Sequence, residues 1–264
     1  FVAKTNGTIL HCETNDPTTW DTSKTITMNM FNGQGVGLAH QNSFLLGFSD
    51  KSIQGFIDNA NVSGSVLSNV ESTAQQVGCA SQNSIVQDES LVTWVGNSFT
   101  GGPTVWMLDG ITSLSEIADS QTRQMLTSEG SSISSVRGNI IRIAGKKFYL
   151  MTLTSADRTF IYDYELKIWC EWESAAGGTH WPFIDFYQHA NGLIAQHDTD
   201  GYIYDISTST YQDNSVNFTV LARFARVDFD TNNRKFVRAI GVNGDKEATT
   251  TNVSLQYSDD DYNT

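Results

Sequence analysis

Histidine and carboxylate side chains are the groups in this sequence that could do catalytic or metal chemistry, but their spacing supports neither. The histidines are His11, His40, His180, His189 and His197. No two of them stand at the short paired spacing of a zinc site, and the sequence has no HExxH, GxSxG or phosphate-loop motif. We therefore expect no catalytic residue, no metal, no cofactor and no enzyme activity.

The stretch QHDTDG at 196–201 places His197, Asp198 and Asp200 beside a glycine. A calcium loop needs further oxygen ligands at fixed positions, and these are missing here. Asp-x-Asp-Gly between two apolar runs is typical of a hairpin turn, so we expect a turn. The carboxylate run at 259–261 has the same interpretation.

The cysteines Cys12, Cys79 and Cys170 are odd in number and far apart, which predicts free buried thiols in a reducing compartment. No apolar run approaches the roughly 18 residues of a membrane span. Because the chain opens at Phe1 without a Met and stops at Thr264 in an apparent strand end, we expect it to be part of a longer protein.

Net charge separates one stretch from the rest of the chain. The formal charge of −13 argues against a protein that grips nucleic acid. Between 223 and 238, however, cations interleave with Phe and Val. The cations are Arg223, Arg226, Arg234, Lys235 and Arg238. They form either an interface with an acidic neighbouring subunit or the solvated face of an amphipathic hairpin that turns at 230–233.

An apolar or aromatic cluster closed by aspartate recurs along the chain, as in IYDYELKIW at 161–169 and IYDISTSTY at 203–211. The five anchors end at Asp21, Asp58, Asp109, Asp163 and Asp205, which are 37, 51, 54 and 42 residues apart. These intervals bracket the roughly 40 to 50 residues of a four-stranded propeller blade. The sequence therefore predicts an all-β propeller of about five to seven four-stranded blades, complete or incomplete in this stretch. We expect each anchor to close an equivalent strand of its blade.

Apolar and polar residues alternate in short runs around 44–48, 92–94 and 148–153, the pattern of half-buried strands. The stretch 112–126 instead favours a short helix between blades, with a capping box at Ser113 and Glu116. We assign the blades to 1–215 and an additional β hairpin region, a closing blade or the start of a second β domain, to 216–264.

Four stretches resemble a known family. They are NDPTTWD at 15–21, GCASQNSIVQDESLVTWVGNSFTGGPTVWML at 78–108, FYLMTLTSADRTFIYDYELKIWCEW at 148–172 and VSLQYSDDDYNT at 253–264. They resemble the tail hub, or packaged-DNA stabilisation, proteins of short-tailed (podovirus-type) bacteriophages, which are related to the tail nozzle proteins. The second and third stretches are the most specific. The last also resembles the aspartate-box turn of sialidase-type propellers, although Asp261 stands near the glycine position and the tryptophan is missing.

The resemblance implies a structural virion protein in the phage tail, assembled in the host cytoplasm. It implies a ring, sixfold by expectation, that extends the DNA channel below the portal and adaptor proteins, retains packaged DNA and mounts the distal needle or tail pieces. Viral DNA would pass through this channel without specific binding.

Two other classes remain open at the level of the sequence. A glycan-binding or glycan-cleaving propeller would need convergent carboxylates in a central pocket, such as Asp185, Asp198 and Glu171. A generic propeller scaffold would bind protein partners in a cell. A mass or particle image of the protein discriminates among them, because a ring of about six subunits fits only the tail protein.

Overall fold

The computed structural model describes residues 1–13, 16–61, 63–97, 101–175, 177–190, 192–210, 212–213, 215–217, 220–222, 239–241 and 253–256. The chain divides into two units, Phe1–Thr219 and Val220–Thr264. Every strand and helix named below belongs to the first unit. The predicted boundary between 215 and 216 stays a prediction, since most of 216–264 lies outside the described residues.

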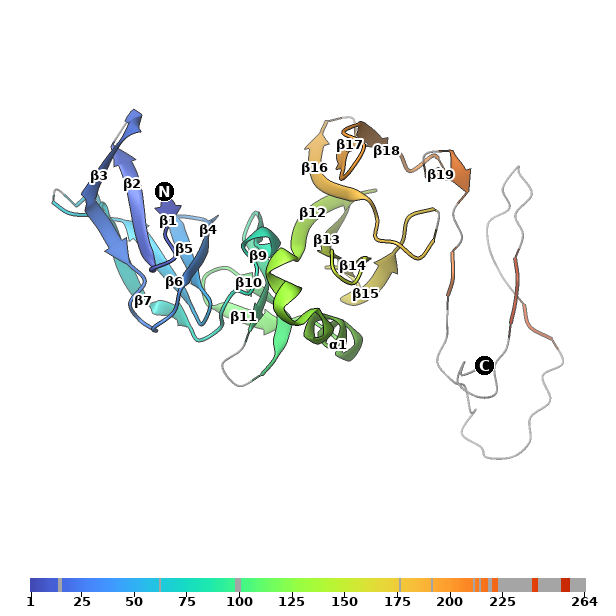
Figure 1. The fold of residues 1–264 in the computed structure, drawn as a ribbon, viewed down its shortest axis with the longest axis horizontal. Coiled ribbons are helices and arrows are strands. Elements are labelled where there is room, and N and C mark those ends of the chain that lie inside the picture. Colours follow the sequence, from blue (N-terminus) through green and yellow to red (C-terminus); the bar gives the residue numbers. More distant parts are fainter. Residues whose placement is uncertain are drawn as a thin grey trace, which may run out of the picture. The chain divides into compact units, whose positions relative to one another are not determined.

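Among the described residues, five antiparallel sheets of three or four strands follow one another along the first unit, each built from consecutive strands (Figure 1). Because each strand pairs with the one before it, every sheet is a meander.

The first sheet holds β1 (Val2–Ala3), β2 (Thr8–Glu13) and β3 (Asp16–Thr27); the second holds β4 (Gly35–Gln41), β5 (Phe44–Ser49), β6 (Ile53–Asp58) and β7 (Leu67–Gln75). The third holds β8 (Val86–Asp88), β9 (Leu91–Asn97), β10 (Pro103–Asp109) and β11 (Ser113–Glu116); the fourth holds β12 (Arg137–Ile143), β13 (Lys146–Leu153), β14 (Arg158–Asp163) and β15 (Ile168–Trp172). The fifth holds β16 (Phe183–His189), β17 (Gly192–His197) and β18 (Ile203–Ile206), and β19 (Gln212–Asp213) pairs with β20 (Val216–Asn217).

Helical segments among the described residues lie between sheets rather than within them. They are the 3-10 turn η1 (Gln82–Ser84), the helix α1 (Ser120–Glu129) and the 3-10 turn η2 (Gly130–Ser135) that follows it. The described part of the chain is therefore all-β, with one short α-helix between the third and fourth sheets, as the sequence predicts.

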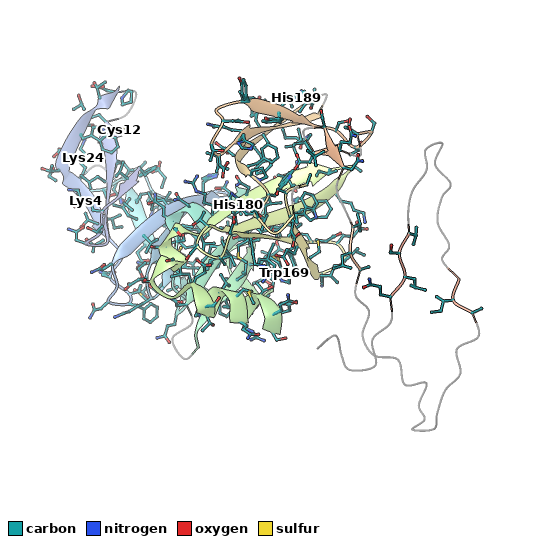
Figure 2. All side chains as sticks on the ribbon, turned by 45° about the vertical axis from the view of Figure 1, so that its right-hand side comes forward. Lys4, Cys12, Lys24, Trp169, His180 and His189 are labelled. Carbon is teal, nitrogen blue, oxygen red and sulfur yellow. The ribbon has the colours of Figure 1, made fainter. Side chains whose placement is uncertain are left out.

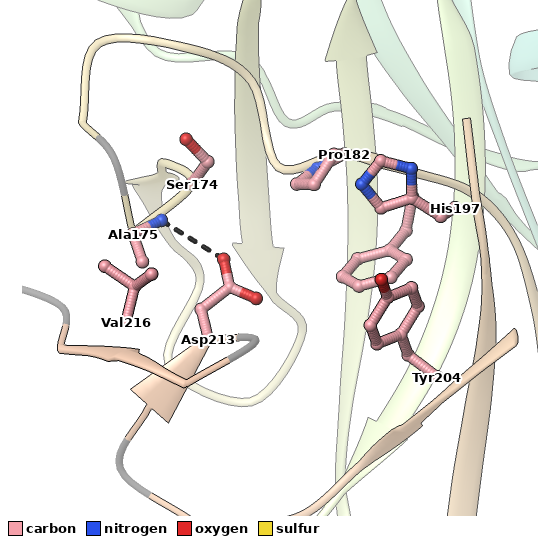
Figure 3. A pocket seen from close by; sticks show the side chains of 8 residues that line it. Ser174, Ala175, Pro182, His197, Tyr204, Asp213 and Val216 are labelled. Carbon is pink, nitrogen blue, oxygen red and sulfur yellow. Dashed lines mark hydrogen bonds between the residues drawn. The ribbon is translucent and has the colours of Figure 1, made fainter. Parts of the chain in front are cut away.

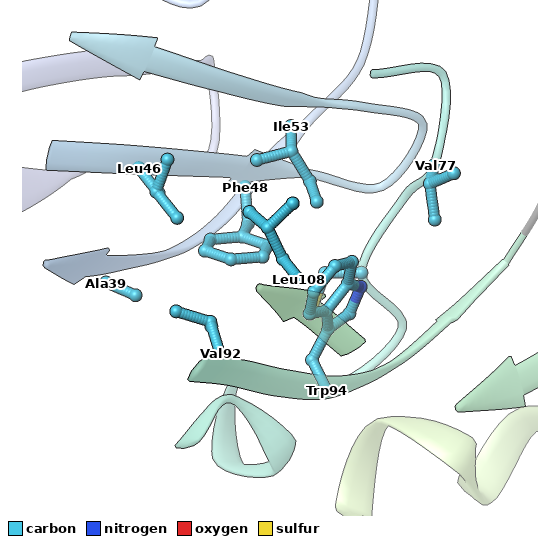
Figure 4. Close-up of a cluster of buried hydrophobic side chains, with 9 residues drawn as sticks. Ala39, Leu46, Phe48, Ile53, Val77, Val92, Trp94 and Leu108 are labelled. Carbon is cyan, nitrogen blue, oxygen red and sulfur yellow. The ribbon is translucent and has the colours of Figure 1, made fainter. Parts of the chain in front are cut away.

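Four apolar clusters join the five sheets, one for each pair of neighbours. Ile9 of the first sheet packs with Phe56 and Leu67 of the second. Leu46 and Phe48 of the second pack with Val92 and Trp94 of the third, and the Phe48 and Trp94 rings meet edge to face with centroids 5.3 Å apart (Figure 4). Two further clusters continue the series: Val95, Val105, Tyr149 and Met151 join the third and fourth sheets, and Ile141, Leu150, Ile161 and Leu193 join the fourth and fifth.

The middle sheets are consequently buried on both faces, which the sequence pattern did not indicate. The alternating runs are strands, as predicted, but residues 92–96 of β9 are all buried. Thr93, a polar residue at an alternate position of β9, is buried too, and its hydroxyl lies 2.6 Å from the Tyr164 hydroxyl. The half-buried expectation was wrong because a neighbouring sheet covers each face of the sheet.

All five predicted anchors lie in the third strand of their sheets. Asp58, Asp109 and Asp163 end β6, β10 and β14, and Asp205 is the penultimate residue of β18. Asp21 lies inside β3 and does not end it. The prediction of equivalent strands is confirmed, while strand closure is wrong for Asp21.

Two of the anchor aspartates, Asp58 and Asp163, use their side chains to hold the turn into the fourth strand of their sheets. Asp58 Oδ1 accepts a 2.8 Å hydrogen bond from the N–H of Ala60, whose φ is 49°. Asp163 Oδ1 accepts from the N–H groups of Glu165 at 2.8 Å and Leu166 at 3.0 Å. An aspartate that bonds the backbone two residues later makes an Asx turn, so at these two anchors turn chemistry accounts for the aspartate.

The helix between the third and fourth sheets starts later than predicted. Ser113 and Glu116 are not a capping box, because they belong to β11, which completes the third sheet by pairing with β10. The helix cap is Asp119, whose Oδ1 accepts a 2.7 Å hydrogen bond from the Thr122 N–H. Pairing with an open sheet edge outweighed the local helix signal in the first turn.

Candidate functional site

The predicted subunit interface cannot be placed from the coordinates, since its residues lie outside the described ones. They are Arg223, Arg226, Arg234, Lys235 and Arg238. The carboxylate run at 259–261 also lies outside the described residues. Both interpretations of these stretches stay predictions.

The QHDTDG stretch is the turn between β17 and β18, as predicted. Asp200 Oδ1 accepts a 2.8 Å hydrogen bond from the Tyr202 N–H, and Gly201 has a φ of 72°. Glycine adopts this left-handed conformation without steric cost. In the part of the chain that the structure describes, no group of three or more His, Cys, Asp or Glu is arranged to hold a metal ion.

The contact between Asp198 and His180 was not predicted from the sequence. His180 lies in the segment between β15 and β16 (Figure 2), and its Nε2 is 2.9 Å from Asp198 Oδ2. Its Nδ1 contacts Asp157 Oδ1, which also accepts the His180 backbone N–H at 3.1 Å. These three residues are separated by unequal intervals and sit in three different connections, so no spacing motif could have indicated them.

Electrostatics at this cluster favour a charged imidazole. Partial burial acts to lower the pKa of His180, but hydrogen bonds to Asp157 and Asp198 outweigh it and hold that pKa above its usual value. The hydrogen bond from His180 in turn lowers the pKa of Asp157. Each shift has the sign expected of an ion pair.

Aromatic rings fill the junction between the fourth and fifth sheets next to His180. Trp181 meets Trp172 edge to face at 5.0 Å and Phe183 at 4.8 Å, and it stacks on Phe186 at 5.4 Å. Edge-to-face and offset-stacked pairs are the arrangements that aromatic quadrupoles prefer. These rings therefore serve packing between the two sheets.

A pocket opens beside this aromatic junction (Figure 3). It is lined by Ser174, Ala175, Pro182, Phe183, His197, Tyr204, Asp213 and Val216. The carboxylates named for a glycan site are not among these residues. Glu171 is paired with Arg158, Asp198 is paired with His180, and Asp185 is exposed and accepts from the Phe186 N–H at 2.9 Å. The geometry therefore gives no support to a glycan-cleaving centre made of these three.

The Gly-Cys-Ala-Ser segment at 78–81 ties three sheets together. The Cys79 N–H donates to the Ser49 carbonyl of the second sheet at 2.8 Å, and the Ala80 N–H donates to the Val95 carbonyl of the third at 2.9 Å. The Ser81 hydroxyl donates to the carbonyl of Val136, which immediately precedes the fourth sheet, at 2.6 Å. This segment belongs to the second of the four stretches on which the family resemblance rests.

A model of the family described as "Bacteriophage P22 Gp10, beta-propeller" matches residues 1–211. The chain belongs to this family. The resemblance to packaged-DNA stabilisation proteins of phage tails is confirmed, and the matched range contains all five sheets. The sheets are accordingly called the first to fifth blades of a phage-stabilisation propeller.

Solved structures resemble this chain only weakly. The computationally designed Ika4 protein aligns with a TM-score of 0.33 and 12% identity, over 68% of this chain and 94% of its own. The AfRom2 CNH domain aligns with a TM-score of 0.29 and 14% identity, over 74% of this chain and 60% of its own. No curated protein matches the sequence.

Ion pairs add a second kind of contact between blades of this phage-stabilisation propeller. Asp88 at the end of β8 lies 2.7 Å from Arg142 and 2.5 Å from Lys147, both in the fourth blade. Glu89 lies 3.0 Å from the same Arg142. Adjacent third and fourth blades are thus joined by charge as well as by apolar packing.

The cysteines of this phage-stabilisation chain differ from the prediction in burial. All three are free, but only Cys79 is buried, while Cys12 is half-buried and Cys170 is exposed. Burial raises the pKa of the Cys79 thiol to about 12. Cys170 is exposed because it lies in β15, the outermost strand of its blade.

None of the helices that the structure describes is both long and apolar enough to cross a membrane.

Proposed function

We propose that this phage tail protein is a hub or nozzle subunit, and that several copies, about six as the family resemblance implies, form a ring around the DNA channel. The ring extends the channel below the portal and adaptor, retains packaged DNA and mounts the distal needle or tail pieces. It is assembled in the host cytoplasm and acts in the virion. Membership in the family of packaged-DNA stabilisation proteins is the observation that carries this proposal.

The packing of the blades supports a mechanical role. Each of the second, third and fourth blades contributes to two apolar clusters, one with each neighbour. Buried faces on both sides make a blade hard to displace without exposing its apolar area to water, at about 25 cal/mol for each Å². A stack held in this way suits a subunit that must bear the pressure of packaged DNA.

The acidic balance supports a channel wall that DNA passes without binding. With a net charge of −13, the chain repels phosphate on average. At physiological ionic strength this repulsion is screened within about 8 Å, so contacts with passing DNA stay weak rather than prohibitive. A basic wall would instead bind phosphate and slow ejection.

We infer that the protein acts by assembly and not by catalysis. The carboxylates best placed by sequence for glycan chemistry are taken up in pairs, as Glu171 with Arg158 and Asp198 with His180. The predicted contact with an acidic neighbouring subunit runs through the basic stretch from 223 to 238, which the sequence alone supports.

The test is reconstitution on DNA-filled heads that carry portal and adaptor but lack this protein. Purified full-length protein is added, and particles are imaged while released DNA is measured with a dye. We expect a ring of about six copies below the adaptor and a marked drop in leaked DNA.

Heads that gain no density at the adaptor, or that leak equally with and without the protein, would contradict the proposal. Bovine serum albumin at equal concentration controls for nonspecific crowding. Hydrolysis of host surface glycan by the purified protein, abolished by changing Glu171 alone, would contradict the inference of a non-catalytic role.

A further inference from the structure

His180 contacts carboxylates from two different blades. Asp157 lies in the turn between the second and third strands of the fourth blade, and Asp198 lies in the same turn of the fifth blade. His180 itself lies in the connection that leads from the fourth blade to the fifth. One imidazole therefore spans the junction between two neighbouring blades.

The geometry requires a doubly protonated ring. A neutral imidazole has a single N–H donor, and an ionised carboxylate can only accept. Both ring nitrogens of His180 face carboxylate oxygens, Nδ1 that of Asp157 and Nε2 that of Asp198 at 2.9 Å. Both contacts are hydrogen bonds only when His180 is an imidazolium, and loss of its proton turns one of them into a repulsion between lone pairs.

Neighbouring side chains on the fifth blade do not take over this role. His197 Nδ1 lies 3.3 Å from Asp198 Oδ1, but the backbone N–H groups of Thr199 and Asp200 already point at this nitrogen, each at 3.3 Å. Asp200 accepts the Tyr204 hydroxyl at 2.7 Å and adds negative charge to the surroundings.

Charged groups on the fourth blade are likewise occupied. Arg158, next to Asp157 in the chain, is paired with Glu171. Glu173 pairs with His180 through its backbone, and its carboxylate accepts the Gly178 N–H at 3.2 Å. The positive charge that Asp157 and Asp198 share is that of His180.

We propose that protonated His180 is a latch between the fourth and fifth blades, and that the latch opens as the pH rises. The inference concerns the fold and does not depend on the proposed ring. When His180 loses its proton, Asp157 and Asp198 face an uncharged ring that offers one N–H. The fifth blade is then held by its apolar cluster and by the hydrogen bond from the Asn139 amide to the Ile184 carbonyl, and its strands open more often.

The direction of the pH dependence follows from linkage. The pKa of His180 is raised in the folded protein above its ordinary value of about 6.5. Stabilisation by the latch is thus fully present below about 6.5 and is lost as the pH rises through the folded-state pKa.

Hydrogen exchange of the full chain, read by mass spectrometry and corrected for the intrinsic pH dependence of exchange, tests the latch. Protection of β16 and β17 peptides is expected to fall by about tenfold for each unit by which the pKa is raised, as the pH rises from below about 6.5 through the folded-state pKa. His180→Gln should show low protection that no longer depends on pH, and its curve should meet that of the wild type at high pH. His40→Gln changes an exposed histidine of the second blade and should keep the wild-type dependence.

A second variant covers the case in which His180→Gln fails to fold. Asp198→Asn removes one carboxylate, so that a neutral imidazole satisfies both partners, and the NMR titration of the His180 ring should move toward the ordinary pKa. The proposal is overturned if β16 and β17 follow the same pH dependence as β9 in the wild type. It is also overturned if His180 titrates identically with and without the Asp198 carboxylate.

Discussion

The hydroxyl of Ser81 lies 2.6 Å from the carbonyl oxygen of Val136, so the residue that leads into the third blade bonds directly to the residue before the fourth. The Ser134 carbonyl oxygen lies 3.0 Å from the same hydroxyl, so the two carbonyls share its single proton. Since Ser81 is 1% exposed, no water can replace it at either carbonyl without rearrangement.

Removing this hydroxyl should therefore destabilise the propeller. Ser81→Ala removes the one O–H that the two carbonyls share, and we expect a loss of about 1 to 3 kcal/mol in the free energy of unfolding, measured by urea denaturation. Ser63→Ala, at an exposed turn, is the matched control and should change stability by less than about 0.5 kcal/mol. Equal midpoints for the two variants would show that the bond between the blades contributes nothing.

Gly78 is expected to tolerate no side chain. A Cβ there would lie 1.9 Å from the Asp50 carbonyl oxygen, so the backbone of the second blade would have to move. Gly78→Ala should cost about 2 kcal/mol or more in thermal or urea unfolding. Gly102→Ala is the control, because its nearest neighbour would be Thr127 Oγ1 at 3.8 Å, an ordinary contact. If Gly78→Ala unfolds at the wild-type midpoint, the close approach of Gly78 to the Asp50 carbonyl does not limit the size of the side chain at position 78.

The turn-capping role of the anchor aspartates can be separated from their charge. Asp163→Ala removes the acceptor for the Glu165 and Leu166 N–H groups, which should cost about 1 kcal/mol. Asp163→Asn keeps an oxygen at the same place and should recover most of that stability. Chemical denaturation of the three proteins decides the matter: an Asn variant as unstable as the Ala variant would point to the negative charge instead.

Thiol reactivity should follow burial rather than position in the sequence. Because burial raises the pKa of Cys79 to about 12, its thiolate is scarce at neutral pH and its side chain is out of reach. We expect maleimide to modify exposed Cys170 within minutes in the native protein and to modify Cys79 only in urea, as read by peptide mass spectrometry. Native labelling of Cys79 at the rate of Cys170 would show that the second and third blades separate readily.

The basic stretch from 223 to 238 should act in assembly and not in folding. Arg226→Glu with Arg234→Glu is expected to change the free energy of unfolding by only about 0 to 1 kcal/mol for each charge. The same double change should weaken ring assembly, most strongly at low salt. Lys51→Glu with Lys146→Glu makes the same charge change at two exposed positions and should assemble normally. Assembly of the arginine variant at wild-type yield across the salt range would reduce the stretch to a solvated hairpin face.

Turn chemistry and strand order were determined by the sequence itself. An aspartate that caps its own turn, as Asp58 and Asp163 do, needs only the two or three residues that follow it, so the repeat is visible without any coordinates. The same holds for the turn at 196–201, where Asp200 and Gly201 act within one hairpin. Meandering sheets also pair strands that are adjacent in the sequence, which keeps the blade period intact.

Contacts between blades were decided only by the tertiary structure. The pairing of His180 with Asp157 and Asp198, the burial of β9 on both faces and the inclusion of Ser113–Glu116 in the third blade each depend on which surface lies opposite. Such contacts join residues that are separated in the sequence by no fixed interval, and their energies come from burial and from charges in a partly desolvated site. Those energies do not exist until neighbouring blades have packed, which is why no local pattern in the chain records them.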